Sequence, residues 1–198
     1  MEYIIIIAMV VGCMFYPIIK AKKTGKKGKE LLQDFESRMN NQGFTRRVVV
    51  YDFLPEFTKN EVENVFEHWW TVGIWIDYQK QLIALRLDRD TWDELVIPFG
   101  KIKSVEINED GHTVTTTGGV VVGGFIIGSG KSKEISKGLQ IRIVSGDIRS
   151  GTEAYYLHLW DPKYGAELKK SDPNYKAIQE CARSIVDEIN NIIMYNKR

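Results

Sequence analysis

The chain has 198 residues and a formal net charge of +1 at pH 7, from 27 Lys and Arg against 26 Asp and Glu. The charge is unevenly distributed, because six lysines lie within residues 20–29 and the rest of the chain is mildly acidic. A nucleic-acid-binding protein more often carries its positive charge on the folded domain, so nucleic acid is not an expected partner. The two cysteines, Cys13 and Cys181, both fall in predicted apolar segments and exclude a disulfide framework.

The first segment, residues 3–19, is an almost unbroken apolar run that the lysines follow at once. About 17 residues rising ~1.5 Å each just cross a bilayer core of roughly 30 Å. Lysines on the C-terminal side place that side in the cytoplasm by the positive-inside rule. Residues 1–20 are therefore expected to form an uncleaved transmembrane anchor. The predicted membrane-embedded residues are Tyr3, Ile4, Ile5, Ile6, Ile7, Val10, Val11, Met14, Phe15, Ile18 and Ile19. The predicted headgroup contacts are Lys20, Lys22, Lys23, Lys26, Lys27 and Lys29.

Two further interpretations of this segment stay open. Residues 10–13, Val-Val-Gly-Cys, are similar to the lipobox of a lipoprotein, although the segment stays apolar after Cys13. The run would also suit a buried helix of a soluble protein. A cleaved secretory signal is not favoured, because the positive charge follows the apolar run instead of preceding it.

Residues 21–43 are expected to form a basic juxtamembrane linker and an amphipathic helix. Within 30–40, apolar residues recur at helical spacing, and Asn41-Gln42-Gly43 ends the pattern. The remaining residues, 44–198, are expected to form one domain. It begins with a strand over 44–53 and a short helix after Thr58, which is followed by Glu61 as in a capping box.

The rest of the domain alternates with period two, which predicts short antiparallel strands. The expected strands cover residues 74–78, 83–87, 94–99, 102–108, 112–117, 139–143 and 155–160. Gln79-Lys80 and Glu109-Asp110-Gly111 are the expected turns between neighbouring strands. Asp172 before Pro173 is a favourable helix start, and apolar residues from Tyr175 to Ile192 then predict a long amphipathic closing helix.

This order of elements resembles a pleckstrin-homology-like (PH-like) fold, in which a bent antiparallel sheet or barrel is closed by a C-terminal helix. The residues are also similar to those of a group of uncharacterised bacterial membrane-anchored proteins with such a domain, over residues 70–194. The similar stretches are 73–77, 83–85, 97–99, 104–107, 109–111, 131–134, 139–143 and 171–176. The resemblance implies an α+β fold in which the transmembrane helix precedes six to seven strands and a capping helix. It implies a binding scaffold at the bacterial inner membrane without choosing a ligand.

The glycine-rich stretch 118–130 is too apolar for an ordinary exposed loop. Gly128-Ser129-Gly130-Lys131-Ser132 invites comparison with a phosphate-binding loop, but Phe125 stands where the first glycine is needed and a strand follows instead of a helix. We expect the stretch either to dip into the bilayer interface or pack on the juxtamembrane helix, or to be buried as a bent hairpin. The residues that would enter the membrane or pack are Val121, Val122, Phe125, Ile126 and Ile127.

No catalytic, cofactor-binding or metal-binding residue is expected. The three histidines, His68, His112 and His158, are far apart and lack neighbours at ligand spacing. Carboxylate pairs such as Glu109-Asp110 fall at turns, where they are poor acid/base candidates. The tryptophans could form a recognition patch, but most are expected in the core or at the headgroups.

These observations predict a non-enzymatic, single-pass protein of the inner membrane. Its domain is expected to face the cytoplasm and to bind a protein or peptide partner. The alternative is recognition of anionic lipid headgroups, for which the available basic residues are Lys101, Lys103, Arg142 and those within 131–137. An enzyme with a site assembled from distant residues is a third, less favoured possibility.

Overall fold

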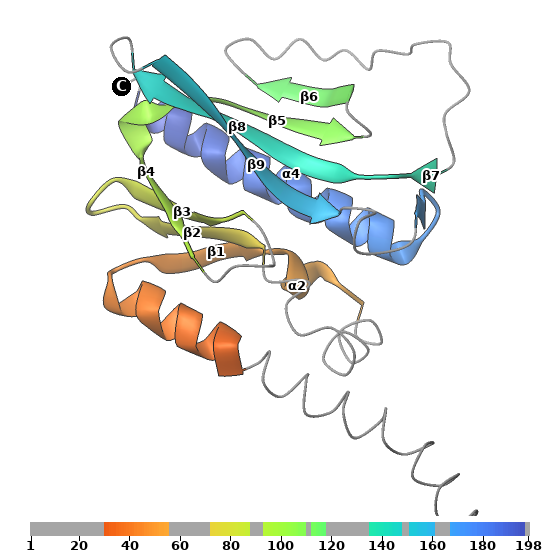
Figure 1. Cartoon of the computed structure of the whole chain (residues 1–198), viewed down its shortest axis with the longest axis horizontal. Helices are drawn as coiled ribbons and strands as arrows, with labels where there is room; N and C mark the ends of the chain where they lie inside the picture. The colour runs from red at the N-terminus through yellow and green to blue at the C-terminus, as the bar shows by residue number, and fades with distance from the viewer. Residues whose placement is uncertain are drawn as a thin grey trace, which may run out of the picture.

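The computed structural model describes residues 30–55, 72–87, 93–109, 112–117, 135–147, 151–160 and 167–196, with backbone only for 112–117 and 147. These residues form an α+β domain in which two antiparallel sheets share one long C-terminal helix (Figure 1). The predicted anchor, its lysines and the glycine-rich stretch lie outside the described residues. In the described part of the chain, no helix has the length and apolarity needed to span a bilayer.

The first sheet has the strand order β1-β2-β3-β4. Its strands are β1 (Thr45–Val49), β2 (Gly73–Asp77), β3 (Leu82–Arg86) and β4 (Leu95–Pro98). The turn between β2 and β3 is held by the Asp77 carboxylate, which accepts hydrogen bonds from the backbone N–H groups of Gln79 (3.0 Å) and Lys80 (2.9 Å). This turn sets the register of the hairpin, in which Ile76 lies opposite Ile83.

The second sheet has the strand order β6-β5-β8-β9 and follows a single 3-10 turn, η1 (Phe99–Lys101). Its strands are β5 (Ile102–Glu109), β6 (His112–Thr117), β8 (Leu139–Asp147) and β9 (Gly151–Trp160). A further pair of two-residue strands, β7 (Ile135–Ser136) and β10 (Leu168–Lys169), lies near the start of the C-terminal helix. In β5 and β8, buried apolar residues alternate with partly exposed residues that are mostly polar, so one face of the sheet forms the core.

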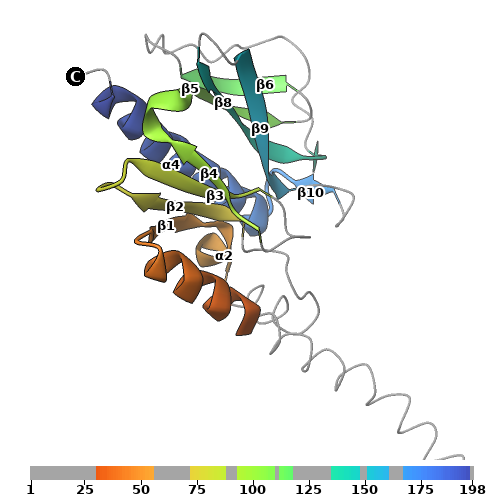
Figure 2. The same ribbon diagram turned by 60° about the vertical axis from the view of Figure 1, so that its left-hand side comes forward.

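The C-terminal helix α4 (Pro173–Tyr195) packs against both sheets (Figure 2). It begins where Asp172 accepts a 2.7 Å hydrogen bond from the backbone N–H of Asn174, with Pro173 in the first turn. Its apolar face fills the space between the sheets, with Ile178, Cys181, Ile185 and Ile189 at most 1% exposed. One continuous core therefore joins both sheets and the helix.

The other face of the first sheet is covered by the helix over residues 30–41, drawn in orange beside β1 in Figure 1. Phe35 (2% exposed) and Met39 (0%) of this helix pack on Trp75 of β2, and the rings of Phe35 and Trp75 meet edge to face at 4.9 Å. The helix ends at Gly43, whose φ of +95° suits a left-handed C-terminal residue. Because both faces of the first sheet are covered, every residue of β2 is buried.

The structure confirms the predicted α+β class, the antiparallel pairing and the C-terminal helix. It differs in two respects. The described strands number ten instead of six or seven, and they form two open four-stranded sheets and one two-stranded sheet instead of a closed barrel. The strand predicted over 44–53 also ends at Val49, because Val50 donates its N–H to the Val72 carbonyl and the chain turns into the short helix α2 (Val50–Phe53), which packs on α4.

Candidate binding groove between two sheet edges

A groove of about 520 Å³ lies where the two sheets approach each other at their outer strands. β4 is the last strand of the first sheet and β9 the last strand of the second. The groove lies between the end of β3, the start of β4 and the middle of β9. We call it the edge groove, and its lining residues are Leu87, Asp93, Glu94, Leu95, Ala154, Tyr155, Tyr156 and His158.

The floor of the edge groove is apolar and its rim is polar. Leu87, Leu95 and Tyr155 are partly buried and pack against the main core. Asp93, Tyr156 and His158 are exposed, and Tyr156 is 39% exposed. A concave apolar surface with a few polar groups around it is the usual form of a binding site.

Within the described part of the chain, no other strand pairs with the edge of β9 that faces the groove. The N–H of His158 points away from β8 and donates a 3.2 Å hydrogen bond to the Leu87 carbonyl. In an antiparallel strand, successive residues direct their backbone groups to opposite sides, and the register of β9 is regular from Gly151 to His158. Tyr156 and Ala154 therefore also direct their N–H and C=O groups away from β8.

The facing edge of β4 follows the same rule. Phe99 donates its N–H to the Gln81 carbonyl at 2.8 Å, and β4 pairs with β3 in the same register. Counting back by two, the backbone groups of Ile97 and Leu95 face β3, while those of Val96 face away from it. Pro98 at the end of the strand has no N–H, which is a common way to limit pairing at a sheet edge.

Acidic groups dominate the rim. Asp93 is exposed. The Glu94 carboxylate forms an ion pair with the guanidinium of Arg38 in the helix over residues 30–41, with 3.0 Å between Oε2 and Nη2. On β9, the Tyr155 hydroxyl donates to Glu153, and this hydrogen bond raises the pKa of Tyr155, with burial and the carboxylate charge adding to the effect. The groove is therefore suited to a cationic ligand, since Arg38 already places a guanidinium at one of its carboxylates.

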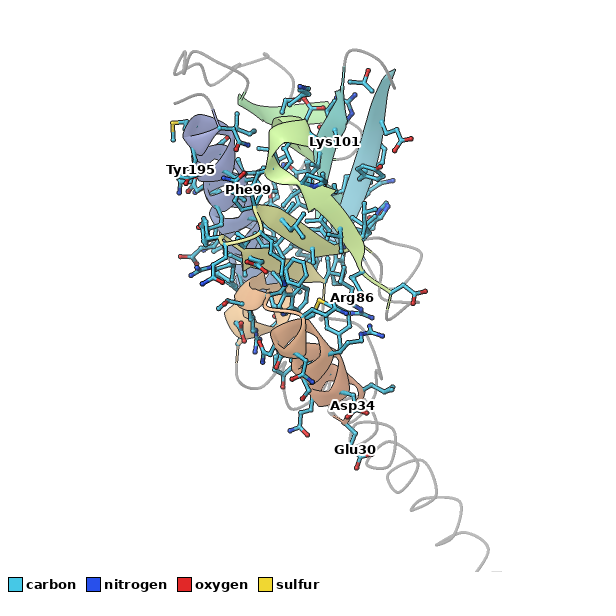
Figure 3. All side chains as sticks on the ribbon, turned by 90° about the vertical axis from the view of Figure 1, so that its left-hand side faces the viewer. Glu30, Asp34, Arg86, Phe99, Lys101 and Tyr195 are labelled. Carbon is cyan, nitrogen blue, oxygen red and sulfur yellow. The ribbon has the colours of Figure 1, made fainter. Side chains whose placement is uncertain are left out.

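Among the described basic residues that would recognise an anionic lipid, two are already paired with carboxylates. Arg142 is paired with Glu106 at 2.6 Å, which raises its pKa, and Lys137 is paired with Glu167 at 3.2 Å. Lys101 and Lys103 are exposed. Figure 3 places Lys101 at the same end of the domain as Tyr195 and at the opposite end from Glu30.

Several other residues that the sequence analysis considered are part of the core or lie singly on the surface. Trp75 is fully buried, so it belongs to the core and not to a recognition patch. Cys181 is free and buried, and burial raises the pKa of its thiol far above the usual range. His158 is exposed and lies between the buried Leu157 and Leu159. Among the residues described, no group of three or more His, Cys, Asp or Glu side chains could hold a metal ion.

Glu109 was expected at the turn between two strands, and it is the last residue of β5, directly before that turn. Its carboxylate is buried, at 8% exposed, and accepts hydrogen bonds from the Tyr175 hydroxyl (3.0 Å) and from Lys170 (3.1 Å). Both donors come from the approach to α4 and its first turn, more than 60 residues later in the chain. This carboxylate therefore joins β5 to the start of α4.

The edge groove was not predicted from the sequence. Its residues come from two segments, 87–95 and 154–158, that are adjacent only because of the order of strands in the two sheets. The available signal was the pair Tyr155-Tyr156, two large aromatic residues that follow Glu153 by two and three positions on a predicted strand. Comparison with known proteins adds no further assignment, since no family model, curated protein or solved structure matches this chain.

Proposed function

We propose that this protein is a membrane-tethered, non-enzymatic adaptor that binds a segment of a partner protein in the edge groove. Residues 1–20 hold the chain in the inner membrane, and the basic residues 20–29 lie against anionic headgroups. The folded domain, a PH-like scaffold, faces the cytoplasm. Confinement to the membrane raises the effective concentration of the domain for any partner at the same surface.

The observation that carries this proposal is the edge groove itself. It combines an apolar floor, an acidic rim and an edge of β9 with which no other described strand pairs. A protein segment can use all three kinds of group. Of the residues whose pKa is clearly shifted, Asp77 and Tyr155 are each held by hydrogen bonds to near neighbours in the chain, and Tyr78 donates to the distant Glu188 of α4.

The alternative function is recognition of anionic lipid headgroups by the domain, and the exposed Lys101 and Lys103 favour it. Two observations count against it. Arg142 is already neutralised by Glu106. Lys101 lies at the opposite end of the domain from Glu30, where the chain arrives from its tether (Figure 3). Contact of Lys101 with the bilayer would therefore require the domain to turn over on the linker.

Cross-linking in native membranes followed by capture of the full chain tests the proposal. Asp93→Arg reverses charge at the rim of the edge groove, and Glu180→Arg makes the same change on the exposed face of α4. The proposal expects a cross-linked partner with the unchanged chain and with Glu180→Arg, and its loss with Asp93→Arg. An identical set of products from all three proteins would contradict it. Liposome binding that needs anionic lipid and is lost in Lys101→Ala would support the lipid alternative.

A further inference from the structure

We infer that the partner segment binds as an added β-strand on the free edge of β9, with alternating apolar and basic side chains. This inference rests on the proposed function, and it specifies both the backbone geometry and the chemistry of the ligand. The occupant is an extended segment of another protein. The juxtaposition that carries it is an edge of β9, paired by none of the strands that the structure describes, beside an apolar floor and an acidic rim.

The first step concerns the backbone. Ala154 and Tyr156 direct their N–H and C=O groups toward the groove, because they share the orientation of His158 on a strand of regular register. The bond from His158 to the Leu87 carbonyl closes one end of this edge, so an added strand begins beyond it. Strand addition at an exposed sheet edge is a general mode of peptide recognition, in which backbone hydrogen bonds supply affinity.

The second step concerns the side chains of the ligand. An added strand directs alternate side chains to opposite faces of the sheet. One set would continue the inner face of β9, where Tyr155 lies with Leu87 and Leu95 on the groove floor. Apolar side chains suit these positions, because the floor is continuous with the main core.

The third step concerns charge. The rim carries Asp93 and Glu94, with Glu153 further along β9. Arg38 of the helix over residues 30–41 pairs with Glu94, and the exposed Asp93 directly precedes Glu94 in the chain. Lys or Arg in the ligand complements this rim, whereas Asp or Glu would be repelled, so charge selects a basic segment.

The test uses the full chain in nanodiscs of phosphatidylcholine and a phage-displayed library of random twelve-residue peptides. Selected peptides are expected to be rich in Lys or Arg alternating with apolar residues. The tightest peptide is then synthesised with a single backbone N-methyl group at each position in turn. We expect about a tenfold or greater loss of affinity at every second position, and about twofold or less at the positions between, because only alternate N–H groups pair with β9.

A matched pair of variants examines the same hydrogen bonds from the protein side. Ala154→Pro removes one outward N–H and leaves the pairing of β9 with β8 intact, and proline is tolerated at such edge positions. Ala154→Val enlarges the side chain and keeps the N–H. We expect Ala154→Pro to weaken the peptide about tenfold or more and Ala154→Val by less than about threefold. The N-methyl series uses the unchanged protein, so it remains decisive if Ala154→Pro does not fold.

Several results would overturn the inference. They are a selection that yields no peptide sensitive to Asp93→Arg, N-methyl effects without alternation, and equal binding to Ala154→Pro and the unchanged chain. A synthetic peptide of residues 20–29 that binds as tightly as the selected peptides would identify the chain's own tether as the occupant, and dimers that exclude the peptide would identify a second copy. If the partner in native membranes is still lost with Asp93→Arg, the adaptor function stands and only strand addition fails.

Discussion

The packing of the helix over residues 30–41 on the first sheet leads to a quantitative prediction for Phe35→Ala. Phe35 is 2% exposed, and its ring meets that of Trp75 at 4.9 Å and 69°. Truncating a buried Phe to Ala costs about 3–5 kcal/mol, including the cavity that remains. An edge-to-face aromatic pair contributes roughly 0.5–1.5 kcal/mol of such a loss. Because small domains have a total stability of about 5–15 kcal/mol, we expect Phe35→Ala to weaken the whole domain severely.

Urea unfolding of the full chain in mild detergent, followed by tryptophan fluorescence and far-ultraviolet circular dichroism, measures this effect. With a urea dependence of about 2 kcal/mol per molar, the midpoint should fall by roughly 1.5–2.5 M. The exposed change Gln33→Ala on the same helix should alter stability by about 0.5 kcal/mol or less. A loss below about 1 kcal/mol for Phe35→Ala, or loss of helix signal alone at an unchanged midpoint, would refute the reasoning that this helix folds as part of the domain.

Three further predictions concern the interior and the turns. Tyr175→Phe removes the hydroxyl that donates to buried Glu109, and the free energy of unfolding should fall by about 1.5–3 kcal/mol; an unchanged urea midpoint would show that the bond contributes nothing. Gly73→Ala places a Cβ 2.4 Å from the Val48 carbonyl, so it should lower stability by about 1–3 kcal/mol, whereas Gly100→Ala meets nothing within 4 Å and should change it little; equal thermal midpoints would contradict this. Backbone hydrogen bonds from the β2–β3 turn, led by that of Lys80, lower the pKa of Asp77 below 3.8. The Asp77 carboxylate should therefore raise the free energy of unfolding over that of Asp77→Asn in full above about pH 5, and by less as the pH drops below 3.8. If urea titrations give the two proteins a stability difference that does not change with pH, the predicted role of Asp77 in the turn is wrong.

Local patterns predicted most of the secondary structure correctly, because their information lies within a few residues. The alternation from Leu139 to Ile143 identified β8, and the Asp172-Pro173 pair identified the start of α4. The pattern failed where tertiary contacts decide the backbone. Val50 continues an apolar run that suits a strand, but its N–H bonds to the Val72 carbonyl and the following residues turn to pack on α4.

The candidate site could not be predicted from the sequence for a related reason. The order of strands within each sheet decides that β4 and β9 are edges, and no local periodicity encodes that order. Glu94 and Tyr155 are 61 positions apart, and their proximity follows only from the packing of the two sheets. The burial of Glu109 was missed similarly, because its partner Tyr175 belongs to a distant element.

Site-specific photo-cross-linking in living cells tests the central claim most directly. A photoreactive phenylalanine analogue would replace Tyr156 at the edge groove, and in a matched protein it would replace Glu180 on the exposed face of α4. The account predicts a discrete protein adduct in the membrane fraction from position 156, absent from position 180 and lost when Asp93→Arg is added. Adducts only to lipid from position 156, or the same protein adducts from both positions, would contradict it.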